Sequence, residues 1–217
     1  MESAGSSMHS FSRNSSPISE MINMTIERPE ILDRVKALGF STFESGADYD
    51  LNIIGERNPK GRADHFDDWL SVIYTIRGIW HHEIFACTTD PGLYWLNNPG
   101  RVEGTAILKH PQQMRGAYTI RKHRGKYDAL CQDQAVTIWR DRNMDNLHDF
   151  SGPEYRGFYG INIHRAGLTN TERVGRYSAG CTVIKESSDF QRLMYLCRMQ
   201  ITRNSWPNFT YTLIEGL

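Results

Sequence analysis

The residues with the clearest chemical potential are one histidine and one cysteine toward the C-terminal end of the chain. His164 ends the strand-like stretch GINIH, and Cys181 follows seventeen positions later in the stretch SAGC. A free thiol with a pKa near ~8.5 is mostly protonated at neutral pH, so a cysteine nucleophile needs a base within hydrogen-bonding reach. It also needs N–H groups aimed at the oxyanion of the tetrahedral intermediate. The spacing therefore suggests a Cys181–His164 pair in direct or nearly direct contact.

The residues just before the cysteine suit such a site. Gly180 permits a tight turn and a close approach of substrate, and the N–H groups of Gly180 and Cys181 are the predicted oxyanion donors. Ser178 is predicted to orient His164 or Cys181, as the third group of a catalytic triad does. Taken singly, the cysteine is also consistent with a small core residue and the histidine with a hydrogen-bonded structural residue.

The combined pattern resembles the signature of L,D-transpeptidase catalytic domains, the YkuD-type fold, in which a loop of about this length separates a histidine from Ser/Thr-His-Gly-Cys. The resemblance covers about residues 157–184. It implies a β-rich cysteine acyltransferase in which Cys181 attacks the L,D-linked carbonyl of a peptidoglycan stem peptide and His164 acts as the base. It also implies that catalysis requires no cofactor.

Two positions depart from this family pattern. Ala179 stands where the family has its second histidine, and Val183 stands where an arginine usually follows the cysteine. The loss of this arginine removes the usual partner of the stem carboxylate. Arg165 and Arg176 are the nearby residues that could replace it in binding substrate.

The stretches DYDLNIIGERN, TTDPG and GINIHRAG also resemble small proteins encoded by tailed phages and bacterial prophages. The two resemblances imply an L,D-transpeptidase, or an L,D-carboxypeptidase or endopeptidase, acting on peptidoglycan or muropeptides, since an acyl-enzyme can pass to an amine or to water. Other virion or lysis proteins are then expected partners. The alternative is a catalytically inactive phage structural or cell-wall-binding protein that retains the fold, which Ala179 and Val183 favour.

A second pattern concerns a metal rather than the thiol. In DRNMDNLHDF, Asp141, Asn143, Asp145 and Asp149 fall at the first, third, fifth and ninth positions of a calcium loop, and Asn146 takes the glycine position. The twelfth position lacks the bidentate glutamate. The prediction is a weak structural Ca²⁺ site, and the alternative is an ordinary polar hairpin turn.

Composition and charge argue against several protein classes. Lys+Arg and Asp+Glu number 25 each, so the chain lacks the basic surplus of a nucleic-acid binder, and its longest apolar run is far shorter than a membrane span. Its four cysteines show no CxxC spacing, which disfavours structural zinc and favours a reducing compartment. The N-terminus has no apolar secretory segment. We therefore expect synthesis in the bacterial cytoplasm, followed by association with a virion or delivery to the periplasm.

The elements that must position these residues are mostly strands. Residues 1–20 are predicted to be a disordered arm or a cloning remnant, residues 21–45 a helical N-terminal segment, and residues 46–217 a single β-rich domain. The stretch SSDFQRLMYLCRMQI has helical spacing, and KHRGK is predicted to be a solvated hairpin tip. The fold class is mainly β (α+β). The family resemblance implies an L,D-transpeptidase-like β-sandwich with short N-terminal helices and one C-terminal helix.

Overall fold

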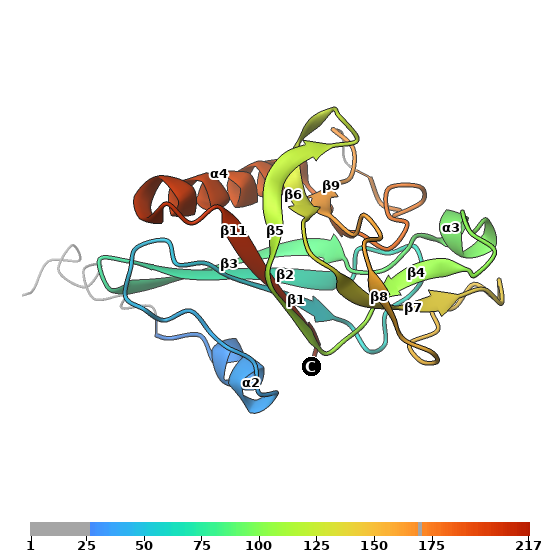
Figure 1. Ribbon diagram of the computed structural model, residues 1–217, viewed down its shortest axis with the longest axis horizontal. Coiled ribbons are helices and arrows are strands. Elements are labelled where there is room, and N and C mark those ends of the chain that lie inside the picture. The colour runs from blue at the N-terminus through green and yellow to red at the C-terminus, as the bar shows by residue number, and fades with distance from the viewer. Residues whose placement is uncertain (1–26, 169–170) are drawn as a thin grey trace, which may run out of the picture.

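The computed structural model describes residues 27–168 and 171–217 (Figure 1). The predicted arm over residues 1–20 and the start of the predicted helical segment lie outside these ranges. Within the segment, one short helix, α2 (Ile31–Ala37), follows Pro29. Its buried face, formed by Ile31, Leu32 and Val35, packs on a separate cluster with Ile54, Ile73 and Ile214 from the main sheet.

The main sheet is a closed barrel. Its eight strands are hydrogen-bonded in the order β1-β11-β5-β6-β9-β10-β3-β2. Their bounds are β1 (Asn52–Arg57), β2 (Asp68–Ile76), β3 (Ile79–Thr88), β5 (Gln112–His123), β6 (Tyr127–Gln132), β9 (Ile163–Arg165), β10 (Thr182–Ile184) and β11 (Asn208–Glu215). The pairs β1–β11 and β9–β10 are parallel, whereas the other neighbours are antiparallel.

A smaller sheet and two helices complete the described chain. The sheet has the order β4-β7-β8, with β4 (Thr105–Leu108), β7 (Val136–Asp141) and β8 (Tyr155–Gly157). Helix α3 (Leu93–Asn97) lies beside this sheet, at the opposite end of the view from α4 (Ser187–Asn204) (Figure 1). The predicted C-terminal helix is therefore present as α4, and β11 follows it.

The prediction of a mainly β chain with a few short helices is confirmed, but the predicted sandwich needs correction. The main sheet closes on itself because β1 pairs with β11 on one edge and with β2 on the other. On the opposite side of the barrel, the three-residue strands β9 and β10 join β6 to β3. A closed sheet has no free edge, so every long strand finds two partners.

The barrel core is formed by inward side chains that alternate along the strands. Tyr118 and Tyr211 meet edge to face inside it, with ring centroids 5.8 Å apart, and the Tyr211 hydroxyl lies 3.0 Å from the Thr182 hydroxyl. Helix α4 contributes the buried Phe190, Leu193, Met194 and Cys197 from one face, as its periodicity predicts. Helix α4 also contacts both β9 and β10.

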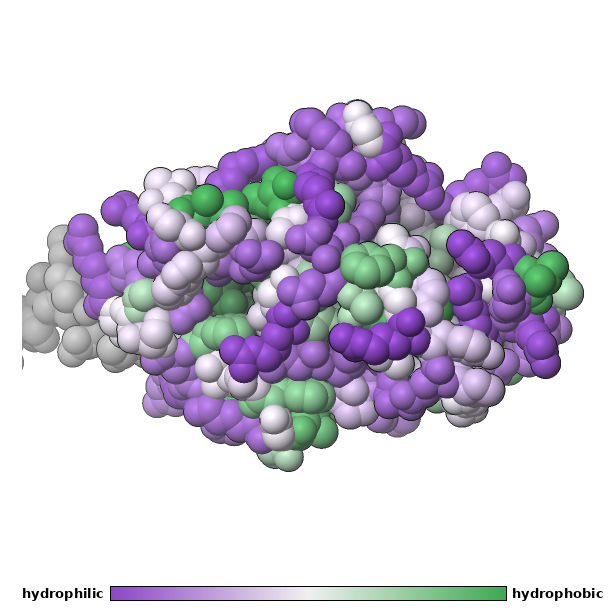
Figure 2. Space-filling model, viewed as in Figure 1, coloured by the Kyte–Doolittle hydropathy of each residue, from purple (hydrophilic) through white to green (hydrophobic). Residues whose placement is uncertain are grey.

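The outer surface is mostly polar. The face seen in Figure 2 is largely hydrophilic, with hydrophobic residues in small separate patches. Within the described residues, every helix is too short or too polar to cross a membrane.

Candidate active site around Cys181 and His164

Strand register places the predicted nucleophile and base on one face of the sheet. In the parallel pair β9–β10, Val183 lies opposite His164 and Thr182 lies opposite Ile163. Ile163 belongs to the barrel core, whereas Cys181 and Val183 belong to a separate cluster outside it. Because successive side chains on a strand alternate between faces, His164 shares the outer face with Cys181, which immediately precedes β10.

The Cys181 thiol is held by backbone groups. Its Sγ donates to the Gly160 carbonyl and accepts the Asn162 N–H, each at 3.4 Å, and the residue is only 9% exposed. Burial raises the pKa of this thiol to about 11, against the opposing effect of the Asn162 N–H. Among the described residues, His164 is not one of its hydrogen-bond partners. A direct hydrogen bond between Cys181 and His164 is therefore absent, and the nearly direct contact that the sequence predicts remains a prediction.

His164 is buried and its tautomer is set by a carbonyl. Its Nδ1 lies 2.8 Å from the Arg165 carbonyl oxygen, which only accepts hydrogen bonds, so we assign the proton to Nδ1 and the free lone pair to Nε2. Burial, together with a smaller effect of neighbouring His123, lowers the pKa of His164 to about 3. The imidazole is therefore neutral at physiological pH, and Nε2 can accept a hydrogen bond.

A second histidine, which sequence reasoning missed, completes the outer face. His123, the last residue of β5, stacks on His164 with ring centroids 4.1 Å apart. Asn162 Oδ1 accepts the Gln132 N–H, so its Nδ2 donates to His123 Nδ1 at 3.0 Å. The backbone N–H of the same asparagine reaches Cys181. Asn162 therefore links the thiol to the histidine pair.

The position of His123 qualifies the prediction for KHRGK. Arg124 and Gly125 form the exposed tip of the β5–β6 hairpin, with positive φ at both residues, as a tight turn requires. His123, in contrast, is buried and pairs across the strands with Tyr127. The sequence feature that could have identified His123 is a histidine at the end of a strand, next to a tight turn and opposite an aromatic residue across the hairpin.

Ser178 and Gly180 shape the loop that carries the cysteine. The buried Ser178 hydroxyl donates to the Cys181 carbonyl at 2.7 Å and accepts the Gly180 N–H at 3.2 Å. Ser178 therefore orients the backbone of Cys181, and its bonds do not include His164. Gly180 has φ +115°, and a Cβ there would overlap the Ala106 carbonyl oxygen of β4. Because Ser178 occupies the Gly180 N–H, the Cys181 N–H is the better candidate for the oxyanion donor.

The two predicted substrate-binding arginines meet in one pocket beside His164. The pocket has a volume of about 420 Å³, and its lining includes Arg165, Arg176 and His164 together with Arg124 and Lys126. Within the described part of the chain, none of these four cations has a salt-bridge partner. Such a pocket favours an anionic ligand.

Aromatic rings position the two arginines. The Arg165 guanidinium lies over the Tyr127 ring at 4.3 Å from its centroid, and the Arg176 guanidinium lies over the Tyr94 ring at 3.9 Å. Stacking leaves the edge N–H groups of a guanidinium available to a carboxylate. The pocket therefore presents two partly pre-ordered donors to an anion.

A second hollow lies on the other side of the cysteine loop. It has a volume of about 240 Å³, and its lining includes Ala179, Trp95, Arg101, Arg140 and Tyr159. Ala179, at the family's second-histidine position, faces this hollow and not the pocket that contains His164. The loop with Cys181 thus contributes to two hollows with different linings.

The predicted calcium residues lie in the loop between β7 and β8. Asn143 Nδ2 donates to Asp145 Oδ2 and Asp149 Oδ2, each at 3.1 Å, and Asp149 N–H donates to Asp141 Oδ2 at 3.1 Å. The structure thus brings all four predicted residues together. In the described ranges, no group of three or more His, Cys, Asp or Glu side chains is already arranged as a metal centre.

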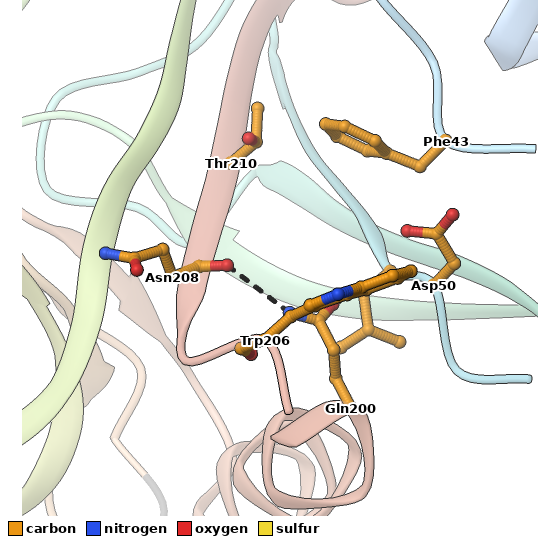
Figure 3. Close-up of a pocket in the computed structure, with 7 residues that line it drawn as sticks. Phe43, Asp50, Gln200, Trp206, Asn208 and Thr210 are labelled. Atoms are coloured by element: carbon orange, nitrogen blue, oxygen red, sulfur yellow. Dashed lines mark hydrogen bonds between the residues drawn. The ribbon is translucent and has the colours of Figure 1, made fainter. Parts of the chain in front are cut away.

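A further pocket lies where β11 begins, away from the histidine pair (Figure 3). It has a volume of about 280 Å³ and is lined by Phe43, Asp50, Leu51, Gln200, Trp206, Asn208 and Thr210. The Trp206 ring lies beside Gln200, whose Nε2 donates to the Asn208 carbonyl at 3.3 Å. No cysteine or histidine lines it, so it offers shape and an aromatic ring but no nucleophile.

Comparison of the chain with protein-family models, curated proteins and solved structures finds no significant match.

Proposed function

We propose that the chain is a cysteine acyltransferase or peptidase of the L,D-transpeptidase type that acts on peptidoglycan stem peptides. The observation that carries this proposal is the common face of Cys181 and His164 on the parallel pair β9–β10. In this proposal the barrel is an L,D-transpeptidase-like arrangement in which β9, the following loop and β10 position the two residues.

The proposed reaction begins from a neutral pair. Burial keeps Cys181 as a thiol and His164 as a free base, so no thiolate–imidazolium pair accumulates at rest. As substrate binds, His164 Nε2 takes the thiol proton while Sγ attacks the scissile carbonyl. The Cys181 N–H stabilises the oxyanion. His164 then protonates the leaving amine as the C–N bond breaks and a thioester remains.

The second half of the reaction restores the enzyme. Water or an acceptor amine attacks the thioester carbonyl while His164 removes its proton; the C–S bond then breaks, and the Cys181 thiolate leaves and takes that proton from His164. Attack by water makes the protein a carboxypeptidase or endopeptidase, and attack by an amine makes it a transpeptidase.

The pocket beside His164 supports the substrate class. Arg165 and Arg176, with Arg124 and Lys126 at the same pocket, offer charge-assisted hydrogen bonds to a stem-peptide carboxylate. In the proposal, Arg165 and Arg176 take the role of the arginine that the family has at the position of Val183. In this proposal a phage or prophage encodes the protein, and a virion or lysis system delivers it to the cell wall.

A binding protein without turnover is the second candidate. Two observations favour it: the Cys181 pKa is raised to about 11 by burial, and Ala179 occupies the position of the second family histidine. Such a protein would use the cationic pocket to hold a stem carboxylate and would leave the thiol unreacted.

A turnover assay separates the two candidates. The purified protein is incubated with disaccharide tetrapeptides and tripeptides, with and without an added amine, and products are read by mass. The proposal expects loss of the terminal residue or its exchange for the amine, abolished by Cys181→Ala. Cys131→Ala is the matched control, because Cys131 is an equally buried thiol, on β6, that takes no part in the proposed reaction. Binding of the fragments with no product from the parent protein would favour the second candidate.

A further inference from the structure

A buried carboxylate at the start of the β7–β8 loop has a hydrogen bond to only one of its two oxygens among the described residues. Asp141 ends β7 and is fully buried. Its Oδ2 accepts the Asp149 N–H, but among the described residues its Oδ1 has no hydrogen-bond partner. An unpaired buried carboxylate oxygen is costly, and natural structures generally supply it with a donor or a cation. The proposed thiol chemistry makes no use of this group.

Two further carboxylates converge on the same loop. Asp145 Oδ2 and Asp149 Oδ2 both accept from the single Asn143 Nδ2, each at 3.1 Å. One weakly positive amide nitrogen thus lies between two negative groups. A cation between the same groups would neutralise them far better. Rotation of the Asn143 amide would then turn its oxygen, in place of its nitrogen, toward that position.

We propose that this loop is a calcium site, with Asp141, Asn143, Asp145, Asp149 and the Leu147 carbonyl as oxygen ligands. These residues alternate along the loop, and Asn146 between them adopts φ +70°, the conformation that a sharp calcium-loop turn needs. The set contains only carboxylate, amide and carbonyl oxygens, which hard cations prefer. Calcium fits better than magnesium, because a flexible loop of protein oxygens suits its larger and less regular coordination shell.

The site would also brace the loop that carries Cys181. His148, inside the calcium loop, lies with Nε2 3.0 Å from the Pro91 carbonyl, and the next residue, Gly92, donates its N–H to the Ser178 carbonyl at 2.9 Å. Asn97 of α3 donates to Asn146 Oδ1 at 2.7 Å. Ordering the calcium loop therefore supports the wall of the candidate active site without placing the ion at the thiol.

The test is thermal unfolding after removal of metal with chelator, followed by titration with CaCl₂ or MgCl₂. At calcium a hundredfold above its dissociation constant, we expect the melting temperature to rise by about 5–10 °C. Equilibrium dialysis should give one calcium per chain. An unchanged melting temperature in excess calcium, or an equal rise with magnesium, would overturn the proposal.

Two variants make the test specific. Asp145→Asn and Asp141→Asn should each lose the calcium-dependent rise, and Asp141→Asn should melt no lower than the metal-free parent, because it removes an unpaired buried charge. The control is Glu103→Gln, an exposed acidic residue in the loop before β4, which should keep the full rise. Retention of the rise in both aspartate variants would contradict the assigned ligands. Because the readout is stability, it does not depend on whether the protein turns over peptidoglycan.

Discussion

The floor and the rim of the candidate active site have opposite physical character. The floor, by which we mean the buried pair Cys181 and His164, has only His164 in the lining of the cationic pocket. Burial raises the pKa of Cys181 and lowers that of His164, so both side chains stay neutral. On the rim, Arg165 and Arg176 stack on tyrosine rings and lack salt-bridge partners among the described residues. In the proposed mechanism this difference is a division of labour: the rim arginines bind the charge of the substrate, and the buried pair reacts from its neutral form.

The largest expected effect comes from removing the floor's nucleophile. Cys181→Ala should reduce turnover of muropeptides by at least ~10³-fold, since the proposed thioester forms on the sulfur that this change removes. Its melting temperature should stay within a few degrees of that of the parent, because the substitution removes only one buried sulfur atom. Turnover at the parent rate in a folded variant would remove Cys181 from the mechanism.

The next effect comes from the base. His164→Gln should lower kcat by about 10²–10⁴-fold, the usual contribution of general acid–base catalysis. His81→Gln is the control, because His81 stacks on Tyr74 at another part of the barrel. If both variants retained the parent kcat, His164 would be a structural residue, and the proposal that the buried pair performs the reaction would be wrong.

Rim variants should act mainly on binding. Arg165→Ala and Arg176→Ala should each raise KM about tenfold, the scale of a hydrogen bond to a charged group, with a smaller change in kcat. The exposed Lys60→Ala serves as a charge-matched control. Substrates with an amidated stem terminus should show little difference between parent and variants. A loss confined to kcat would contradict a binding role and would show that these arginines act in the chemical step.

The smallest effect concerns pH and stability. The folded-state pKa of His164 lies near 3, below the ordinary value near 6.5, so the unfolded state binds the extra proton between these values. The resulting stability is present above about pH 6.5 and is lost as pH falls toward 3. His164→Gln should therefore lose less stability than the parent over this window, as measured by urea unfolding. Identical pH profiles would show that burial does not hold the ring neutral.

Sequence reasoning predicted the local parts of this site and missed the long-range ones. His164, Cys181, Arg165 and Arg176 all lie within one short stretch, so a strand–loop–strand pattern predicts that they lie near one another; of the four, His164 and the two arginines share one pocket. His123 escaped because it arrives from the β5–β6 hairpin, and only the register of β6 against β9 brings that hairpin to His164.

The same limit applies to the fold. Alternation along individual strands predicted a mainly β chain, and helical spacing predicted α4. Barrel closure depends on the parallel pairing of β1 with β11, which are distant in sequence, so no local pattern reveals it. The calcium loop is intermediate. Its spacing is visible in the sequence, but the unpaired buried oxygen of Asp141 depends on the tertiary packing around β7.

The central claim is that Cys181 forms a covalent acyl intermediate from the neutral pair. Its most direct test is the intact mass of the protein, quenched in acid shortly after mixing with a disaccharide tetrapeptide and digested to locate any adduct. The account predicts a mass increase equal to the acyl fragment on the peptide that contains Cys181, present in the parent and in Cys131→Ala and absent in Cys181→Ala. Product formation without any adduct on Cys181, or an adduct that persists in Cys181→Ala, would contradict it.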